Sequence, residues 1–323
     1  MKELVVVAIG GNSIIKDNAS QSVEHQAEAV KAVAESVLEM LASDYDIVLT
    51  HGNGPQVGLD LRRAELAHEY EGLPLTPLAN CVADTQGGIG YLIQQALNNQ
   101  LAQRGEQKAV TIITQVEVDK DDPGFEHPTK PIGAFFSAAQ RDALLQQHPT
   151  WHFVEDSGRG YRRVVASPEP KRIVEADAIR ALTQQGFVVI GAGGGGIPVV
   201  RGPQGDYQSV DAVIDKDLST ALLAREISAD VLVITTGVEK VCVHFGKPNQ
   251  RELGQVTVPE MTRYMEEGHF PPGSMLPKIA ASLAFLHHGG KRVVITSPEC
   301  LPAALRGETG THIVNVLEGR RDE

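Results

Sequence analysis

The chain has 323 residues, of which 42% are hydrophobic and 22% are charged, and it carries a formal net charge of −12 at pH 7. This is the composition of a globular protein long enough for one large α/β domain. Because the acidic residues are spread along the chain, neither a nucleic-acid surface nor binding to an anionic membrane is expected. The three cysteines lack C-x-x-C spacing and no stretch reaches the roughly 18 apolar residues of a membrane span, so we expect a cytoplasmic protein without a disulfide framework or zinc site.

Strand-like and helical stretches alternate along the chain. Continuous apolar runs predict strands at residues 4–9, 46–50, 110–114, 187–190, 231–236, 292–296 and 312–316. Helical stretches are predicted at about residues 23–41, 84–101, 175–185, 217–228 and 277–288. Strands that are apolar throughout and alternate with helices indicate an α/β fold, in which a parallel sheet is covered on both faces and joined by right-handed crossovers.

A polar or glycine-rich cluster follows five of these strands. The clusters are residues 10–12 (GGN), 51–54 (HGNG), 191–196 (GAGGGG), 235–237 (TTG) and 296–298 (TSP). In an open α/β sheet the carboxyl ends of the strands line one edge, where ligands bind. The sequence therefore predicts a binding site assembled from these five clusters.

Four consecutive glycines, Gly193 to Gly196, stop the apolar run of residues 187–190. Without Cβ atoms they allow positive φ and a close approach of backbone N–H groups to an anion, although a tight turn would also need glycine. With Gly191 and Asp211 the loop matches the G-x-G-x-x-G fingerprint of NAD-dependent oxidoreductases. That fingerprint must open into a helix, whereas residues 197–200 (IPVV) are expected to be extended, so NAD binding stays a remote alternative.

Residues 117–168 interrupt the alternation of strands and helices. They are rich in proline, glycine and charge, and they are too long for a connection between a strand and a helix. We interpret them as an inserted, lid-like excursion over the site.

Three lysines occur in turn-bounded surroundings rather than on clearly solvated helix faces. Lys130 lies between Thr129 and Pro131, Lys216 lies between Asp215 and Asp217, and Lys278 follows Pro277 at an expected helix start. A single lysine is most often a solvated surface charge, and only the shared setting of these three singles them out.

Three ammonium groups near glycine loops suit phosphoryl transfer, whose transition state requires positioning and positive charge. Gly10–Gly11 and Gly193–Gly194 could hold the phosphoryl group and its acceptor, Lys216 and Lys278 could neutralise the two ends, and Asp217 could orient these lysines. The neighbouring acidic pair could also favour Mg²⁺. The Walker motif and the G-x-S-x-G motif are absent from the sequence, and His148 and His152 flank Pro149, so a P-loop enzyme, serine hydrolysis and metal-dependent hydrolysis are disfavoured.

Taken together, these motifs resemble those of the carbamate kinases in the amino-acid kinase superfamily. The resemblance spans nearly the whole chain and rests on residues 10–12, 50–58 (THGNGPQVG), 127–133 (HPTKPIG), 160–165 (GYRRVV), 191–199, 213–224 (VIDKDLSTALLA), 245–250 (FGKPNQ), 273–279 and 295–297. It implies an open three-layer αβα sandwich with a mainly parallel sheet and a small protruding subdomain. It also implies a homodimer that catalyses reversible transfer of the γ-phosphoryl group of MgATP to carbamate, in arginine metabolism.

The resemblance also assigns parts of the chain and individual residues. Residues 1–323 would form one domain, with the carbamate in residues 1–200, the nucleotide in residues 201–323 and the protruding insertion at 117–168. The implied catalytic residues are Lys130 on the acceptor side, Lys216 and Lys278 on the phosphates, and Asp217, which organises them. Substrate binding would involve Gly11, Asn12, Gly52, Asn53, Gly54, Gly193 and Gly194, and nucleotide binding Gly10, Gly11, Asp215, Lys216, Thr235, Thr236, Met275 and Lys278. Mg²⁺ would be carried by ATP or ADP rather than by a protein metal site.

Three positions depart from the family pattern. Leu276 replaces a glycine, Ser13-Ile14 replaces Ala-Leu, and His244 stands where the family favours Asn. They leave two alternatives open: a paralogue that phosphorylates another small carboxylate or amide, and a regulatory protein that only binds the nucleotide.

Overall fold

An eight-stranded sheet forms the centre of the computed structural model, which describes residues 2–10, 14, 22–104, 108–156, 158–272 and 274–315. In spatial order the strands are β15 (Gln255–Thr257), β17 (Thr311–Val314), β16 (Arg292–Thr296), β12 (Val231–Thr235), β1 (Glu3–Ile9), β2 (Tyr45–His51), β9 (Val188–Ile190) and β3 (Ala109–Thr111). All neighbouring strands pair in parallel except β16 and β17, which are antiparallel. The predicted mainly parallel sheet is confirmed.

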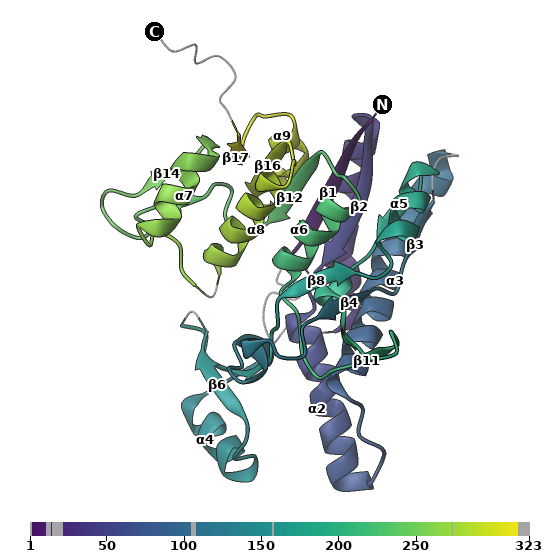
Figure 1. Cartoon of the computed structure of the whole chain (residues 1–323), viewed down its shortest axis with the longest axis vertical. Helices are drawn as coiled ribbons and strands as arrows, with labels where there is room; N and C mark the ends of the chain where they lie inside the picture. The colour runs from purple at the N-terminus through teal and green to yellow at the C-terminus, as the bar shows by residue number, and fades with distance from the viewer. Residues whose placement is uncertain are drawn as a thin grey trace.

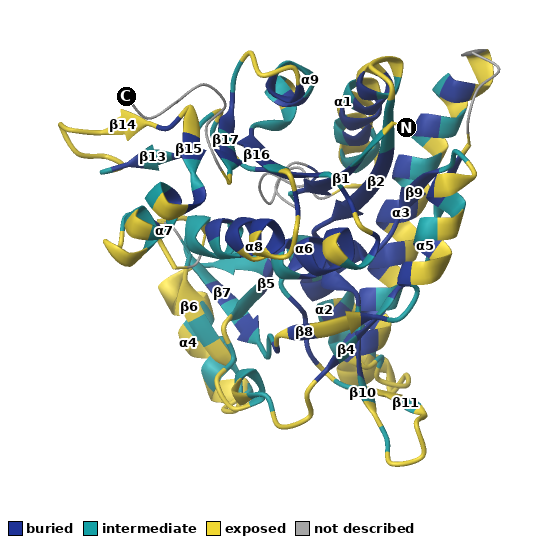
Figure 2. Ribbon diagram, turned by 45° about the horizontal axis from the view of Figure 1, so that its top comes forward, coloured by how far each residue is buried: buried dark blue, intermediate teal, exposed yellow. Residues whose placement is uncertain are grey.

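Helices cover both faces of this sheet (Figure 1). On one face lie α1 (Val23–Ala42), α3 (Leu78–Arg104) and α9 (Leu301–Leu305), and on the other lie α5 (Ala176–Gln184), α6 (Lys216–Glu226) and α8 (Met275–His287). In β1, Val5 and Val7 belong to the hydrophobic core beneath α1, α3 and α9, and Val6 and Ala8 belong to the core beneath α5, α6 and α8. Successive side chains of a strand point to opposite faces, so a strand buried on both sides must be apolar throughout. Figure 2 shows the buried centre, and the three-layer αβα sandwich is confirmed.

A second, four-stranded sheet lies beside the main one in the order β11 (Tyr207–Ser209), β10 (Ile197–Arg201), β4 (Gln115–Val118) and β8 (Pro170–Ile173). The strand predicted at 110–114 is shorter than expected, because β3 ends at Thr111 and the next strand, β4, starts at Gln115 in the second sheet. Between them the Gln86 side chain accepts a hydrogen bond from Thr114 N (2.9 Å) and donates one to Thr114 O (3.0 Å). This amide takes the place of a neighbouring strand and lets the chain change sheets.

The excursion contains a small protruding subdomain of one antiparallel sheet and one helix (Figure 1). Its elements are a 3₁₀ turn (Pro123–Phe125), β5 (Lys130–Phe136), α4 (Ala138–Gln147), β6 (His152–Glu155) and β7 (Tyr161–Val165), with the strand order β5-β7-β6. It packs against α2 (Gly54–Glu71) so closely that a Cβ on Gly58 would collide with the backbone of Gly133. Arg163 strengthens this contact, because its guanidinium bonds Glu65 at 2.6 Å and stacks over the Trp151 ring.

The remaining elements are peripheral or short. They are α7 (Val258–Glu266), the hairpin of β13 (Cys242–Val243) and β14 (Arg251–Glu252), and 3₁₀ turns at Gly193–Gly195 and Pro298–Cys300. A capping box fixes the start of α7, because Thr257 and Glu260 bond each other's backbone N–H. Among the helices of the described residues, none is both long and apolar enough to span a membrane.

Candidate functional site

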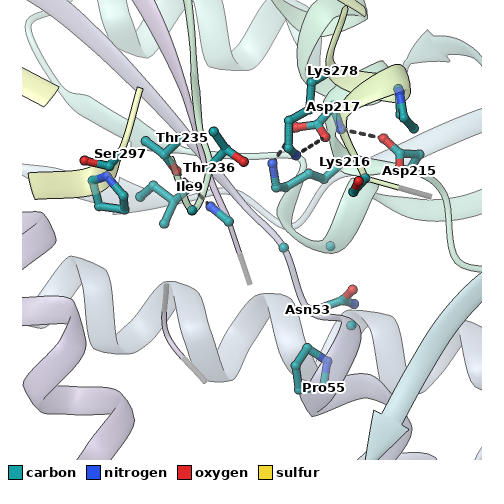
Figure 3. A pocket seen from close by; sticks show the side chains of 18 of the residues that line it. Ile9, Asn53, Pro55, Asp215, Lys216, Asp217, Thr235, Thr236, Lys278 and Ser297 are labelled. Carbon is teal, nitrogen blue, oxygen red and sulfur yellow. Dashed lines mark hydrogen bonds and ion pairs between the residues drawn. The ribbon is translucent and has the colours of Figure 1, made fainter. Parts of the chain in front are cut away.

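A cavity of about 590 Å³ lies at the carboxyl ends of the central strands, where the sequence predicted a binding site (Figure 3). The end of β12 and the loops after β1, β2, β12 and β16 supply Gly10, Gly52, Asn53, Thr235, Thr236, Gly237 and Ser297 to its wall. The protruding subdomain contributes Lys130, Pro131, Asp156, Arg159 and Arg162. The site therefore lies between the main sheet and the subdomain.

Three helices begin at this cavity. Gly54 and Pro55 of α2, Lys216 and Asp217 of α6, and Pro277 and Lys278 of α8 all line it. The N-terminus of a helix carries free N–H groups and a partial positive charge. Three converging N-termini make the cavity suited to a ligand with several negative charges, such as a polyphosphate.

Lys216, Asp217 and Lys278 form a buried ion cluster (Figure 3). Lys216 Nζ lies 2.5 Å from Asp217 Oδ1, and Lys278 Nζ lies 2.8 Å from Asp217 Oδ2. Only 8% of the surface of Lys216 is exposed. One carboxylate thus orients two ammonium groups, and the cluster keeps a net positive charge.

The pKa shifts of Asp217, Lys216 and Lys278 reflect the net positive charge of this cluster. Burial alone would raise the pKa of Asp217, but Lys216 and Lys278 outweigh it and hold this pKa well below the usual range of a carboxyl group. Burial lowers the pKa of Lys216, and the Lys278 charge adds to this effect. Burial also opposes the charge of Lys278, yet the proximity of Asp217 raises its pKa. An anionic ligand would supply the second negative charge that the two lysines, which share Asp217, lack.

Asp215 joins the subdomain to this cluster. Its Oδ1 caps α6 by accepting a hydrogen bond from Asp217 N at 2.9 Å, and its Oδ2 lies 2.7 Å from Lys130 Nζ. Burial opposes the charge of Asp215, but the Lys130 ammonium prevails and lowers the pKa of this carboxyl. Lys130 thereby reaches from β5 to the start of α6.

The glycine loop is buried under the cavity. Gly194 has φ +65°, and a Cβ there would collide with the Asn53 side chain, while a Cβ on Gly193 would collide with His51. These contacts explain why glycine is required at both positions. After Gly196 the chain enters β10 instead of a helix, as expected, so the dinucleotide fingerprint lacks its structural context.

Most residues that the sequence singled out meet at the cavity. Its wall includes Gly10, Gly52, Asn53, Gly54, Lys130, Gly194, Asp215, Lys216, Asp217, Thr235, Thr236 and Lys278. Gly193 lies behind the wall, and Met275 packs against the core of the sheet at the start of α8. Gly11 and Asn12 lie outside the described residues.

Sequence reasoning missed Asp156, Arg159 and Arg162, which the subdomain brings to the cavity. Arg162 lies within the GYRRVV motif and Arg159 directly precedes it, but sequence reasoning assigned no role to the residues of this motif. Leu276, which replaces a family glycine, lies within α8 and has no positive φ, so its position does not require glycine here. His244 does adopt φ +55°, and its ring packs edge-on against His269.

An open, mainly parallel sheet whose strand ends and helix N-termini meet at a lysine-rich cavity defines an α/β protein that handles phosphate. Residues 3–297 match the model of the amino acid kinase family. The chain therefore belongs to the amino acid kinase family.

Relatives and solved structures agree with this assignment. The carbamate kinase-like protein YahI of Escherichia coli K12 is 84% identical over 97% of this chain and 99% of its own length. The carbamate kinase of Thermococcus kodakarensis is 46% identical, covering 96% of this chain and 98% of its own. Giardia lamblia carbamate kinase bound to AMP-PNP superposes with a TM-score of 0.87 at 38% identity, covering 97% of this chain and 98% of that one.

Proposed function

We propose that this protein is a carbamate kinase, which transfers a phosphoryl group reversibly between MgATP and carbamate. The observation that carries the proposal is the buried Lys216–Asp217–Lys278 cluster at the start of α6 and α8. The resemblance to carbamate kinases over nearly the full chain indicates that the acceptor is carbamate.

The chemistry follows from where the charges lie. In the direction of ATP synthesis, an oxygen of the ADP β-phosphate attacks the phosphorus of carbamoyl phosphate, and the bond from phosphorus to the carbamate oxygen breaks. The electron pair stays on the departing carbamate. Lys216 and Lys278 neutralise the phosphoryl oxygens during transfer, and Asp217 keeps both ammonium groups in place. Lys130 acts from the acceptor side.

Mg²⁺ fits this site as a partner of the nucleotide. Both oxygens of Asp217 and one oxygen of Asp215 already hold lysines, and among the described residues no group of three or more His, Cys, Asp or Glu side chains could bind a metal ion. Mg²⁺ keeps several waters and binds through substrate phosphates. It supplies charge neutralisation at the phosphates, and the lysines hold the nucleotide that carries it.

The proposal divides the chain into two functional parts. The loops after β1 and β2, together with the lid-like insertion at 117–168, hold the carbamate, and the part after about residue 200 holds the nucleotide. This division is supported by Lys130, which reaches Asp215 from the insertion, and by Thr235, Thr236 and Lys278, which line the cavity from the part after residue 200.

A homodimer belongs to the same proposal. Tyr91 in α3 is 57% exposed and Ile113 after β3 is 50% exposed. The two elements touch, since a Cβ on Gly90 would collide with the Thr111 side chain, and β3 is an edge strand of the main sheet. A second copy would cover these apolar side chains. A cytoplasmic location and a role in arginine metabolism complete the proposal, and the free thiols of all three cysteines suit a reducing compartment.

The deciding experiment is a coupled assay of ATP formation from carbamoyl phosphate and MgADP, with acetyl phosphate as the matched alternative donor. We expect turnover with carbamoyl phosphate and much slower turnover with acetyl phosphate. A preference for acetyl phosphate would identify a paralogue that acts on another carboxylate. Binding of MgADP in calorimetry without turnover on either donor would identify a regulatory nucleotide-binding protein.

A further inference from the structure

Arg162 of β7 lines the cavity, yet two of its three guanidinium nitrogens have no hydrogen-bond partner among the described residues. Only 6% of its surface is exposed, and its Nη1 donates to Asp156 Oδ2 at 3.2 Å. Its Nε and Nη2 are buried and have no hydrogen-bond partner among the described residues. Unpaired donors of a buried guanidinium are costly, so this edge of Arg162 requires acceptor atoms that the described part of the chain does not provide.

The unpaired edge lies against the first turn of α2. Nη2 is 3.6 Å from the place that a Cβ on Gly54 would occupy. The N-cap residue Asn53 does not cap this helix, because its side chain donates to Thr85 Oγ1 at 3.0 Å. The guanidinium and the positive end of the helix dipole therefore face each other, which is favourable only when an anion is bound beside them.

The subdomain side of the cavity also has more positive than negative charge. Asp156 is shared by two guanidinium groups, since its Oδ1 lies 3.1 Å from Arg159 and its Oδ2 lies 3.2 Å from Arg162. The buried cluster has the same ratio of one carboxylate to two cations, because Asp217 pairs with both Lys216 and Lys278. The cavity thus has two places for negative charge, one at the lysines and one at Arg162.

Resting on the phosphoryl transfer proposed above, we propose that Arg162 binds the acceptor, donating hydrogen bonds from Nε and Nη2 to the oxygens of its carboxyl-type group. Nε and Nη2 form one edge of a planar fork, which matches two oxygens in a plane, as in the carboxylate of carbamate. When the bond from phosphorus to carbamate breaks, the electron pair spreads over those two oxygens. Arg162 stabilises that charge while the lysine cluster holds the phosphoryl group.

Two substitutions and a matched control test this role. Arg162→Gln removes the charge, and Arg162→Lys keeps the charge but loses the planar fork. Arg141→Gln is the control, because Arg141 lies in α4 of the same subdomain, bonds Asp142 and stacks over Tyr161, but does not line the cavity. Steady-state ATP synthesis is measured with carbamoyl phosphate and ADP varied separately, and thermal unfolding reports whether each variant is folded.

We expect both Arg162 variants to raise the KM for carbamoyl phosphate about ten-fold or more, the usual loss for a charge-assisted hydrogen bond, and to leave the KM for ADP within about two-fold. Arg141→Gln should match the wild type. If folded Arg162→Lys keeps the wild-type KM for carbamoyl phosphate, or if both KM values rise together, Arg162 does not bind the acceptor. A wild-type protein that makes no ATP would overturn the proposed function itself, which separates that failure from this one.

Discussion

Lys278 offers the sharpest test of the charge arrangement. We consider Lys278→Met, which keeps a similar length and removes the ammonium. Lys278 Nζ lies 2.8 Å from Asp217 Oδ2, while Lys216 holds the other oxygen of the same carboxylate at 2.5 Å. The substitution therefore leaves a neutral Lys216–Asp217 pair, and the net positive charge of the cluster disappears.

The expected loss is in the chemical step. Removing one preorganised group that stabilises transition-state charge usually lowers kcat by about 10²- to 10³-fold, equivalent to roughly 3–4 kcal/mol. The fold should survive, because Asp217 retains Lys216 as a partner and is not left as an uncompensated buried charge. The KM for ADP should change far less than kcat.

The assay is steady-state ATP synthesis from carbamoyl phosphate and ADP, with thermal unfolding in parallel. Lys291→Met is the control, since Lys291 also pairs with an aspartate, Asp230, at 2.7 Å but is exposed and does not line the cavity. A folded Lys278→Met protein with wild-type kcat would refute the reasoning that this lysine stabilises the transferring group.

Three further outcomes are expected. Lys130→Ala should weaken the apparent affinity for carbamoyl phosphate and leave that for ADP nearly unchanged in steady-state kinetics, because Lys130 reaches the site from the subdomain; the reverse pattern would mean that the insertion serves the nucleotide. His51 is buried, and burial lowers its pKa from 6.5 to about 4, so its contribution to stability is present above pH 6.5 and is lost as the pH falls towards 4. The free energy of unfolding of the wild type, measured with urea, should therefore fall by about 3 kcal/mol more than that of His51→Gln between pH 6.5 and pH 4. If the two proteins lose stability in parallel, His51 is not responsible for the pH dependence. Tyr91→Lys should convert a dimer into monomers in light scattering after size-exclusion chromatography, whereas an unchanged mass would place the interface elsewhere.

The sequence alone determined the strands of the main sheet, except the short β15 at its edge, and the place of the site. Residues 292–296 were predicted as a strand and form β16 with the same limits, and the apolar run at 4–9 lies within β1. The signal is local, because a strand buried on both faces has no polar position to interrupt it. The glycine and threonine clusters were equally visible, since the carboxyl ends of parallel strands must share one edge.

Only the tertiary structure decided which groups pair. Lys130 and Asp215 are separated by 85 positions, and Lys278 and Asp217 by 61, so no local pattern could join them. The antiparallel pairing of β17 with β16 and the change of sheet after Thr111 also depend on long-range contacts, such as those of Gln86 with Thr114.

The pair Arg162–Arg163 shows most clearly what cannot be predicted from the sequence. In sequence the two arginines are equivalent, but consecutive residues of β7 point to opposite sides of its sheet. Arg163 consequently bonds Glu65 of α2, while Arg162 lines the cavity with an edge that has no hydrogen-bond partner in the described part of the chain. Which of the two arginines lines the cavity was fixed by the pleat of one strand and by its packing against α2, neither of which the order of amino acids displays.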